Sequence, residues 1–211
     1  MKKIVGSLGA ALCSVVLLGC PGGEQGGGAK AEAVAPAVEA PKPGAATPEE
    51  AYTQAKQCVS GGDWKGFYGL IVPATRDEAL GGMVFAASMM AGFSDDKAKK
   101  DAVEALSKRH AIGEPSKEVK GEQLQAEMAR VVSTVADKPG CFADFMAWLQ
   151  ANAKEGRKLE LGTLERVTIT GDTAQGFEVL PKPDGTKTEK PMRFQKVDGR
   201  WFMDLTAKDK K

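Results

Sequence analysis

The sequence predicts an α+β fold, in which N-terminal helices pack on one face of a four-stranded antiparallel β-meander. Two observations predict this class. Apolar residues recur with a helical period from Thr47 to about Glu155, and after Gly156 the period changes to two, as in strands with one buried face. The turn sequence Asp198-Gly199 then separates the last two predicted strands, which makes them a hairpin.

Length and charge exclude several classes of protein. The chain has 211 residues, 29 Lys and Arg, 28 Asp and Glu, and 42% hydrophobic residues. This length fits one ordinary domain with appendages. A net charge of +1 lacks the excess of Lys and Arg that binds nucleic acid, so we expect no nucleic-acid partner. The hydrophobic content argues against full disorder, and only the N-terminal stretch is long and uncharged, which excludes several membrane spans.

Residues 1–19 have the pattern of a bacterial secretion signal. Met1-Lys2-Lys3 is positively charged, and the uncharged run that follows is shorter than the ~20 residues that a membrane span needs. The run ends in Leu17-Leu18-Gly19-Cys20, which resembles the lipobox of bacterial lipoproteins. This resemblance implies cleavage between Gly19 and Cys20 and lipidation of Cys20, and two or three acyl chains would hold the protein on a membrane. An uncleaved anchor and ordinary secretion are the alternatives.

Residues 20–47, after the signal, are expected to form a disordered tether. They are rich in Gly, Pro and Ala and contain no aromatic residue, so they bury too little apolar surface to offset ordering. A flexible segment of this length typically reaches about 30 Å. Pro21 stands where an Asp would imply inner-membrane retention in enteric-type sorting, so the resemblance favours the outer membrane. We therefore predict a lipid-anchored, periplasm-facing protein of the cell envelope.

The soluble domain, residues 48–211, is predicted to begin with two helices. Thr47-Pro48-Glu49-Glu50 combines an N-cap, a first-turn proline and an acidic residue that can complete a capping box. This helix is expected to stop at Gly61-Gly62, where glycine supplies a left-handed C-cap. Asp63 is then expected to cap a short second helix that Pro73 ends.

The next segment carries no charge between Ala79 and Ser94, and a capping box at Thr75–Glu78 is expected to open it. We interpret it as a helix buried on most sides, rather than as a membrane-active segment. The methionines of the domain are scattered over several predicted elements, so we interpret them as core filling rather than as a copper site.

Three further helices are predicted before the sheet. Ser94 is expected to cap one that runs towards His110, and Leu124, Met128, Val131, Val132 and Val135 mark an amphipathic one that should end at 138–140. The last helix is predicted to place Phe142, Phe145, Met146 and Leu149 on one face.

The predicted sheet has four strands. The first contains Leu159, Leu161, Val167 and Ile169, with a kink near Gly162, and it ends in the turn Gly171-Asp172. Phe177 and Val179 mark the second strand. Asp198-Gly199 predicts a two-residue hairpin turn, since both central residues of that turn need a positive φ. Its register pairs Phe194 with Met203 and Met192 with Leu205.

Residues at the two ends of the domain, Thr47–Ala51, Gly62–Trp64 and Phe194–Asp204, resemble small lipoproteins of the nuclear-transport-factor-two-like superfamily. That superfamily also contains ketosteroid isomerases and polyketide cyclases, so the resemblance implies a cone-shaped fold with a pocket lined by Asp, His or Tyr. Tyr52, Tyr68, Asp63 and Asp204 are available, but no motif singles out any of them, and the catalytic residues stay unknown.

Cysteine and histidine usage limits the chemistry. Cys13 leaves with the signal and Cys20 carries lipid, so Cys58 and Cys141 remain as a pair, for which we predict a disulfide in an oxidising compartment. It would add about 4–5 kcal/mol of stability; two separately buried thiols are the alternative. With one histidine, His110, and no Cys-x-x-Cys, we expect neither a metal site nor a cofactor. His110 is expected to end its helix at the core edge, rather than to act as an acid or base.

Three functions remain open. The first is a non-enzymatic, lipid-anchored module that binds a small apolar ligand or an envelope protein. The second is an isomerase- or cyclase-like enzyme that works in a conical pocket, and the third is a structural envelope protein. An enzyme requires a deep cavity with a buried acid, whereas a binding module needs only an apolar groove.

Overall fold

A computed structural model of the chain describes residues 43–114, 116, 123–153, 159–182 and 185–205. The predicted signal, the lipobox at 17–20 and most of the predicted tether lie outside these residues. In the described ranges, helices precede a four-stranded antiparallel sheet, which confirms the α+β class. The predicted tether reached residue 47, but Ala45 is 1% exposed and pairs with Trp201, so the folded part begins earlier than predicted.

The first two helices are α1 (Pro48–Gly61) and α2 (Trp64–Gly69), and both begin as the sequence predicts. The Thr47 hydroxyl accepts a hydrogen bond from the Glu50 N–H at 3.1 Å. Gly62, with a φ of 70°, provides the left-handed C-cap of α1. Asp63 caps α2 by accepting from the Gly66 N–H at 2.9 Å.

The next two helices, α3 (Arg76–Gly92) and α4 (Lys97–Arg109), begin differently from the prediction. A short 3-10 turn, η1 (Pro73–Thr75), precedes α3, and the Thr75 hydroxyl donates to the Val72 carbonyl instead of capping the helix. Asp96, rather than Ser94, caps α4, because its carboxylate directly precedes the helix and accepts from the Ala98 N–H at 2.9 Å. The Ser94 hydroxyl instead accepts a hydrogen bond from the Asp96 N–H at 3.2 Å, within the turn that precedes the helix.

The last two helices are α5 (Leu124–Val131) and α6 (Lys138–Asn152). Lys138-Pro139-Gly140 begins α6, whereas the sequence predicted only the end of the preceding helix at these residues. Asp137 caps α6 by accepting from the Gly140 N–H at 2.9 Å, and a proline in the first turn has no intrahelical hydrogen bond to lose. The predicted apolar face of this helix is confirmed for its buried members, Phe142, Phe145 and Met146.

The sheet consists of β1 (Thr163–Thr170), β2 (Thr173–Pro181), β3 (Lys187–Val197) and β4 (Arg200–Asp204), in that spatial order. Asp198 and Gly199 have φ angles of 50° and 77°, and Phe194 pairs with Met203, which confirms the predicted hairpin. The predicted pair of Met192 with Leu205 does not form, because β4 ends at Asp204 and Leu205 is exposed.

The first strand begins later than predicted and bends elsewhere. β1 starts at Thr163, after Gly162, whereas the predicted strand included Leu159 and Leu161. The bend predicted near Gly162 lies instead at Arg166, which has a φ of 55° where the pairing with β2 shifts register. Gly162 has another role, because a Cβ there would lie 2.2 Å from the Val179 carbonyl oxygen.

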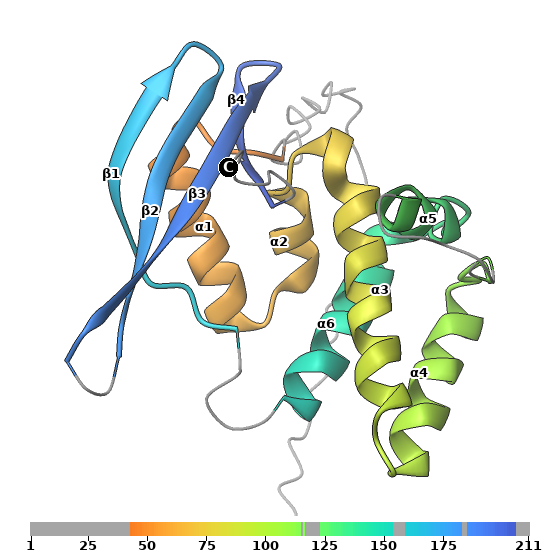
Figure 1. Cartoon of the computed structure of the whole chain (residues 1–211). Helices are drawn as coiled ribbons and strands as arrows, with labels where there is room; N and C mark the ends of the chain where they lie inside the picture. Colours follow the sequence, from red (N-terminus) through yellow and green to blue (C-terminus); the bar gives the residue numbers. More distant parts are fainter. Residues whose placement is uncertain (1–42, 115, 117–122, 154–158, 183–184, 206–211) are drawn as a thin grey trace, which may run out of the picture. The chain divides into compact units, whose positions relative to one another are not determined.

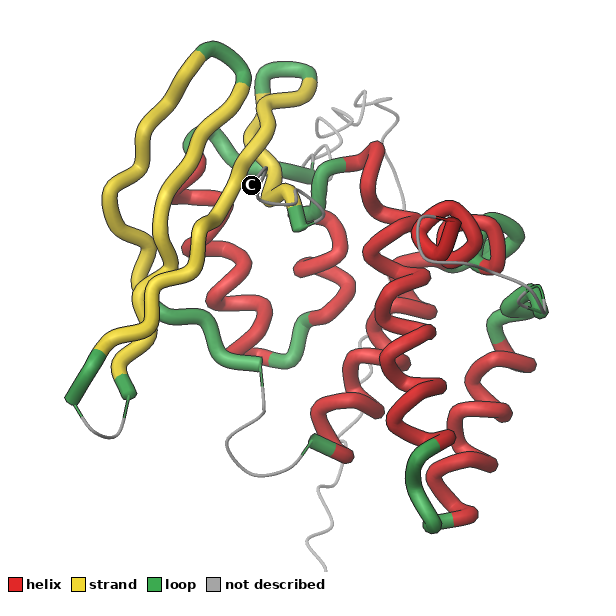
Figure 2. Tube along the Cα trace, in the orientation of Figure 1, coloured by secondary structure: helices red, strands yellow, loops and turns green. Residues whose placement is uncertain are grey.

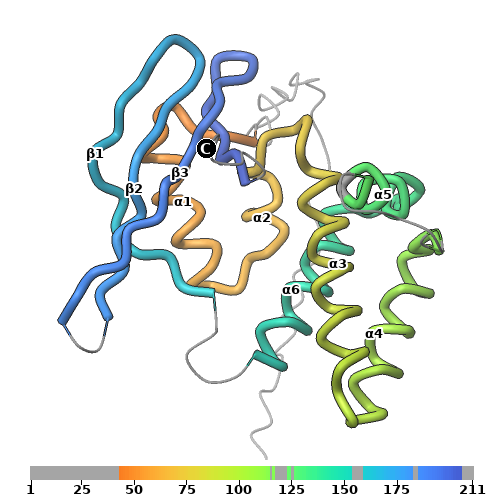
Figure 3. The backbone as a smooth tube through the Cα atoms, viewed as in Figure 1, coloured from red at the N-terminus to blue at the C-terminus, as the bar shows by residue number. Residues whose placement is uncertain are grey.

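Figures 1, 2 and 3 show the same order of elements across the domain. Helices α1 and α2 lie beside the sheet, α3 and α6 lie beyond them, and α4 and α5 flank α3 on the side away from the sheet. The outer edge of β4 is also covered: the Trp201 N–H donates to the Ala45 carbonyl and the Met203 N–H donates to the Leu70 carbonyl, each at 2.8 Å. Helices α3, α4 and α5 lie farther from the sheet than α1 and α2, and the larger pocket of the described residues lies among them.

Candidate functional site

Helix α3 has one buried and one exposed apolar side. Its buried side consists of Leu80, Gly81, Val84, Ala87 and Ala91. The exposed side carries Phe85, Met89 and Phe93, which are 40%, 42% and 82% exposed and follow one another at helical spacings of four. The expectation of a helix buried on most sides is therefore wrong, as is core filling for Met89 and for Met90, which is 38% exposed.

The exposed side of α3 forms one wall of a groove, which we call the α3–α5 groove. This pocket of about 750 Å³ lies between α3, α4 and α5, a volume typical of small-molecule sites. Its apolar lining comes mainly from α3 and α5: Val84, Phe85, Met89, Leu124, Met128 and Val131. Phe93 is not part of this lining.

Gly81 sets the distance between α3 and α5 at the groove. A Cβ at this position would lie 2.3 Å from the Met128 carbonyl oxygen, so the two backbones are in direct contact. Only glycine allows that approach without a shift of one helix. The neighbouring Gly82 has no atom within 4 Å of its Cβ position, so the close approach involves one residue only.

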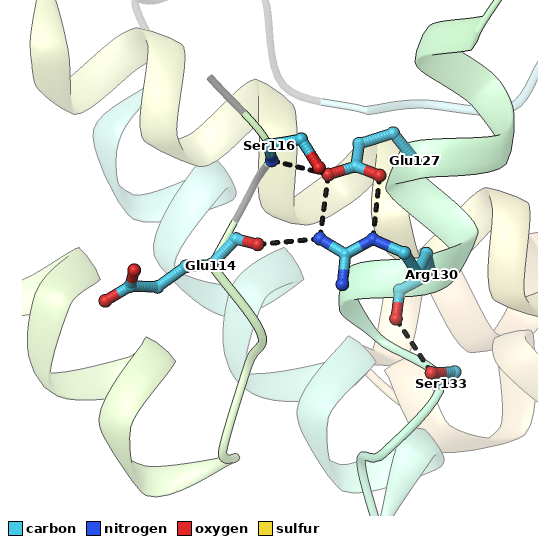
Figure 4. Close-up of polar contacts among 5 residues, drawn as sticks. All are labelled: Glu114, Ser116, Glu127, Arg130 and Ser133. Atoms are coloured by element: carbon cyan, nitrogen blue, oxygen red, sulfur yellow. Dashed lines mark hydrogen bonds and ion pairs between the residues drawn. The ribbon is translucent and has the colours of Figure 1, made fainter. Parts of the chain in front are cut away.

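An ion pair on α5 holds the loop that follows α4 (Figure 4). Arg130 donates from Nε to Glu127 Oε2 at 2.7 Å and from one terminal nitrogen to Oε1 at 2.8 Å. The same terminal nitrogen donates to the Glu114 carbonyl at 2.7 Å, and the Ser116 N–H donates to Glu127 at 2.6 Å. The Arg130 hydrogen bond, more than any other contact, lowers the pKa of Glu127 to about 2. This carboxylate is therefore charged at neutral pH and fixes one rim of the groove.

The α4 side of the groove carries a second ion pair. Lys108 Nζ lies 2.5 Å from Glu104 Oε1, one helical turn earlier, and both residues line the groove. Both side chains are largely exposed, so this pair contributes little to stability.

His110 joins the end of α4 to α6. It is the C-cap residue of α4, which confirms the expected helix-end position. Its Nε2 lies 2.9 Å from Asp144 Oδ2, and Arg109 contacts the same oxygen at 3.1 Å. The hydrogen bond to His110, followed by that to Arg109, lowers the pKa of Asp144. His110 does not line the α3–α5 groove, and its contact with Asp144 joins the end of α4 to α6.

Cys58 and Cys141 are free thiols in the structure, in place of the predicted disulfide. Each has its own surroundings. Cys58 Sγ lies 3.9 Å from Asp63 Oδ2, and both residues line a second pocket of about 510 Å³ together with Gln54 and Gln57. Cys141 is fully buried on α6, and burial raises its pKa to about 12. Burial, followed by the Asp63 carboxylate, also raises the pKa of Cys58, so neither thiol is activated as a thiolate nucleophile.

A buried acid that the sequence analysis missed lies between α1 and the sheet. Glu178 on β2 is 4% exposed, and its Oε1 accepts hydrogen bonds from the Tyr52 hydroxyl at 2.9 Å and the Gly162 N–H at 3.0 Å. Burial, the hydrogen bond to Glu178 and the charge of Glu178 raise the pKa of Tyr52 above its usual range. The signal was the alternation on β2, where Glu178 follows Ala174 and Gly176 at a spacing of two.

The polar residues considered for an enzymatic pocket are not gathered in one cavity. Asp63 is the N-cap of α2 and lines the smaller pocket, whereas Tyr52, Tyr68, Asp204 and Glu178 line neither of the two pockets. The Tyr68 ring packs on Phe142, with ring centroids 5.2 Å apart. These residues therefore do not form an acid–base constellation around either pocket.

Two further observations concern the described residues as a whole. No three His, Cys, Asp or Glu side chains in these ranges come together as a metal site would require. Among their helices, none combines the length and the apolar composition of a bilayer span. Comparisons of the whole chain with protein-family models, curated proteins and solved structures found no match.

Proposed function

We propose that this chain is a lipid-anchored protein of the cell envelope that binds a small apolar ligand in the α3–α5 groove. The observation that carries the proposal is the exposed apolar side of α3, where Phe85 and Met89 line a pocket of about 750 Å³. Contiguous apolar surface that stays exposed in a folded protein is typical of ligand-binding grooves and interaction sites.

The composition of the groove suits an apolar ligand. A ligand that covers Phe85 and Met89 removes apolar surface from water, which contributes about 25 cal/mol for each Å² buried. Met89 on α3 and Met128 on α5 both line the groove, and their flexible thioether side chains can adapt to the shape of a ligand. The apolar lining of the groove thus supplies binding energy for such a ligand, which supports a binding protein.

The ligand site can be tested with octanol as a neutral apolar probe of the purified full chain. Isotope-labelled methionine methyl groups report on each site by nuclear magnetic resonance. We expect octanol to shift the methyl signals of Met89 and Met128 and to leave those of Met192 and Met203 on the sheet unchanged.

A pair of variants controls this experiment. Ser88 lines the groove and is exposed, so Ser88→Phe should fill the pocket and abolish the shifts. Phe93→Ser removes an 82% exposed side chain outside the lining and should leave them unchanged. Octanol bound at a site other than the groove would change the methyl signals of the parent and of both variants equally. Unchanged Met89 and Met128 signals in the parent at saturating octanol would overturn the proposed ligand site.

The anchor rests on Leu17–Cys20 and is tested separately. Cys20→Ala should leave an unprocessed or unacylated product, measured as the mass of the purified protein and its partition into detergent. Cys58→Ala, which removes a thiol from the folded domain, is the matched control and should be processed like the parent. Maturation and detergent partition of Cys20→Ala at the level of the parent would refute the proposed anchor.

A further inference from the structure

We infer that the ligand of the α3–α5 groove is a monocationic amphiphile: an alkyl chain with a single positively charged headgroup, which Glu114 holds at the rim. This inference rests on the proposed function, because it requires the groove to be a ligand site. It adds the chemical class of the headgroup, which the apolar lining alone does not specify.

The described rim of the groove has one carboxylate in excess. Three acidic residues line it: Glu104, Glu114 and Glu127. Lys108 pairs with Glu104 at 2.5 Å, and Arg130 forms two hydrogen bonds with Glu127. Both cations are thus matched by carboxylates of their own, and the charge of Glu114 is the one left over among these residues.

The backbone of Glu114 is tied to α5, whereas its carboxylate contacts no other residue in the described ranges. Arg130 donates to the Glu114 carbonyl at 2.7 Å, which ties the residue to α5. The Glu114 carboxylate has no hydrogen-bond or ion-pair partner among the described residues, and Figure 4 shows it directed away from the Arg130 guanidinium. Within the described part of the chain, a ligand cation would therefore meet an exposed carboxylate that no other side chain contacts, beside an apolar pocket.

An anionic headgroup would fit the same rim less well. A ligand carboxylate would have to compete with Glu127 for Arg130 or with Glu104 for Lys108, and it would lie close to the negative charge of Glu114. A neutral headgroup would gain only the apolar contacts. The charges of the rim therefore predict the order of affinity amine, then alcohol, then carboxylate at equal chain length.

Three probes with the same eight-carbon chain test this order: octylamine, octanol and octanoate. Dissociation constants come from the methyl signals of Met89 and Met128, measured on the purified full chain at neutral pH. An exposed ion pair contributes ~0.2–1 kcal/mol, so we expect octylamine to bind about 1.4-fold to fivefold tighter than octanol and octanoate to bind more weakly. Added salt should reduce the advantage of the amine and leave octanol unaffected.

Two charge-neutralising variants locate the effect. Glu114→Gln should remove the advantage of octylamine and leave the affinity for octanol unchanged. Glu49→Gln removes one exposed carboxylate from α1 and should preserve the advantage, although it changes the net charge equally. An advantage that persists in Glu114→Gln would overturn the assignment of Glu114.

The remaining outcomes separate this inference from the proposed function. If the three probes bind equally, or octanoate binds most tightly, the inference is wrong while the groove remains an apolar ligand site. If none of the probes shifts the Met89 and Met128 signals, the proposed ligand site itself fails.

Discussion

Tyr52 on α1 and Glu178 on β2 are joined by a buried hydrogen bond of 2.9 Å between positions 126 residues apart in the chain. The same Glu178 oxygen accepts from the Gly162 N–H at 3.0 Å, so one carboxylate connects α1, β2 and the residue that precedes β1. The Tyr52 hydroxyl is the donor of this bond, and burial together with Glu178 raises its pKa further above neutral pH. This contact fixes the first helix on the sheet.

Removing the Tyr52 hydroxyl should destabilise the domain. Tyr52→Phe leaves Glu178 buried with only the Gly162 N–H as donor, and an imperfectly satisfied buried group costs about 1–3 kcal/mol. Urea unfolding followed by circular dichroism measures the change. Tyr68→Phe is the matched control, because the Tyr68 hydroxyl has no hydrogen-bond partner among the described residues. Equal losses in the two variants would mean that the Tyr52–Glu178 contact adds no stability.

Two neighbouring glycines of α3 should respond in opposite directions to alanine. Gly81→Ala places a Cβ against the Met128 carbonyl and should cost about 1–3 kcal/mol through displacement of α5. The Cβ that Gly82→Ala adds has no neighbouring atom within 4 Å, so this variant should stabilise the domain by up to about 1 kcal/mol, since alanine favours the helix. Thermal or urea unfolding measures both changes. A loss of stability in Gly82→Ala, or a gain in Gly81→Ala, would contradict the packing of α3 on α5.

The ion pair of Glu127 predicts how stability changes in acid. The folded-state pKa of Glu127 is about 2, below its ordinary value, so its contribution is present above the unfolded-state pKa and is lost as the pH falls towards about 2. Arg130→Gln removes the main cause of this shift and should raise the pKa of Glu127 towards about 4.3, its unperturbed value. Carboxyl chemical shifts report that titration directly.

Lys97→Gln controls for the loss of a cation. Lys97 pairs with Asp101 on the exposed side of α4, outside the network of Glu127. We expect this variant to leave the pKa of Glu127 unchanged. A titration of Glu127 that is the same in Arg130→Gln as in the parent would show that the ion pair does not persist in solution.

The two cysteines should differ in their reaction with a maleimide. Burial, followed by the nearby Asp63 carboxylate, raises the pKa of Cys58, so its half-buried thiol should react slowly near pH 8. Cys141 is 0% exposed and should react only after unfolding. Mass spectrometry counts the labelled thiols. Asp63→Asn retains a good N-cap for α2 and should speed the labelling of Cys58.

The same measurement tests the predicted disulfide. If Cys58 and Cys141 are joined in the native protein, neither thiol labels under denaturing conditions without a reductant. Full labelling of both would establish the free thiols of the structure.

Local signals predicted the local structure. Thr47 and Asp63 cap helices as their positions in the sequence indicate, and Asp198-Gly199 forms the expected turn, because each depends on contacts within a few residues. The errors at Ser94 and at Lys138–Gly140 are also local. In both places an aspartate that directly precedes the helix, Asp96 or Asp137, provides the cap.

The candidate site depends on long-range packing, which periodicity does not determine. The uncharged segment of α3 has apolar residues on all sides, so the sequence alone does not indicate that Phe85 and Met89 stay exposed. That exposure follows from the positions of α4 and α5. The Glu127–Arg130 pair resembles an ordinary helical ion pair in the sequence, and only the fold brings the Glu114 carbonyl to it.

The pairing of Ala45 with Trp201 has a mechanical consequence. The two residues exchange main-chain hydrogen bonds of 3.0 and 2.8 Å, and the Arg200 side chain donates to the neighbouring Gly44 carbonyl. A pull on the chain ahead of Pro43 is resisted first by these bonds along the border of β4. The edge of the sheet would therefore take up the tension before it reaches α1.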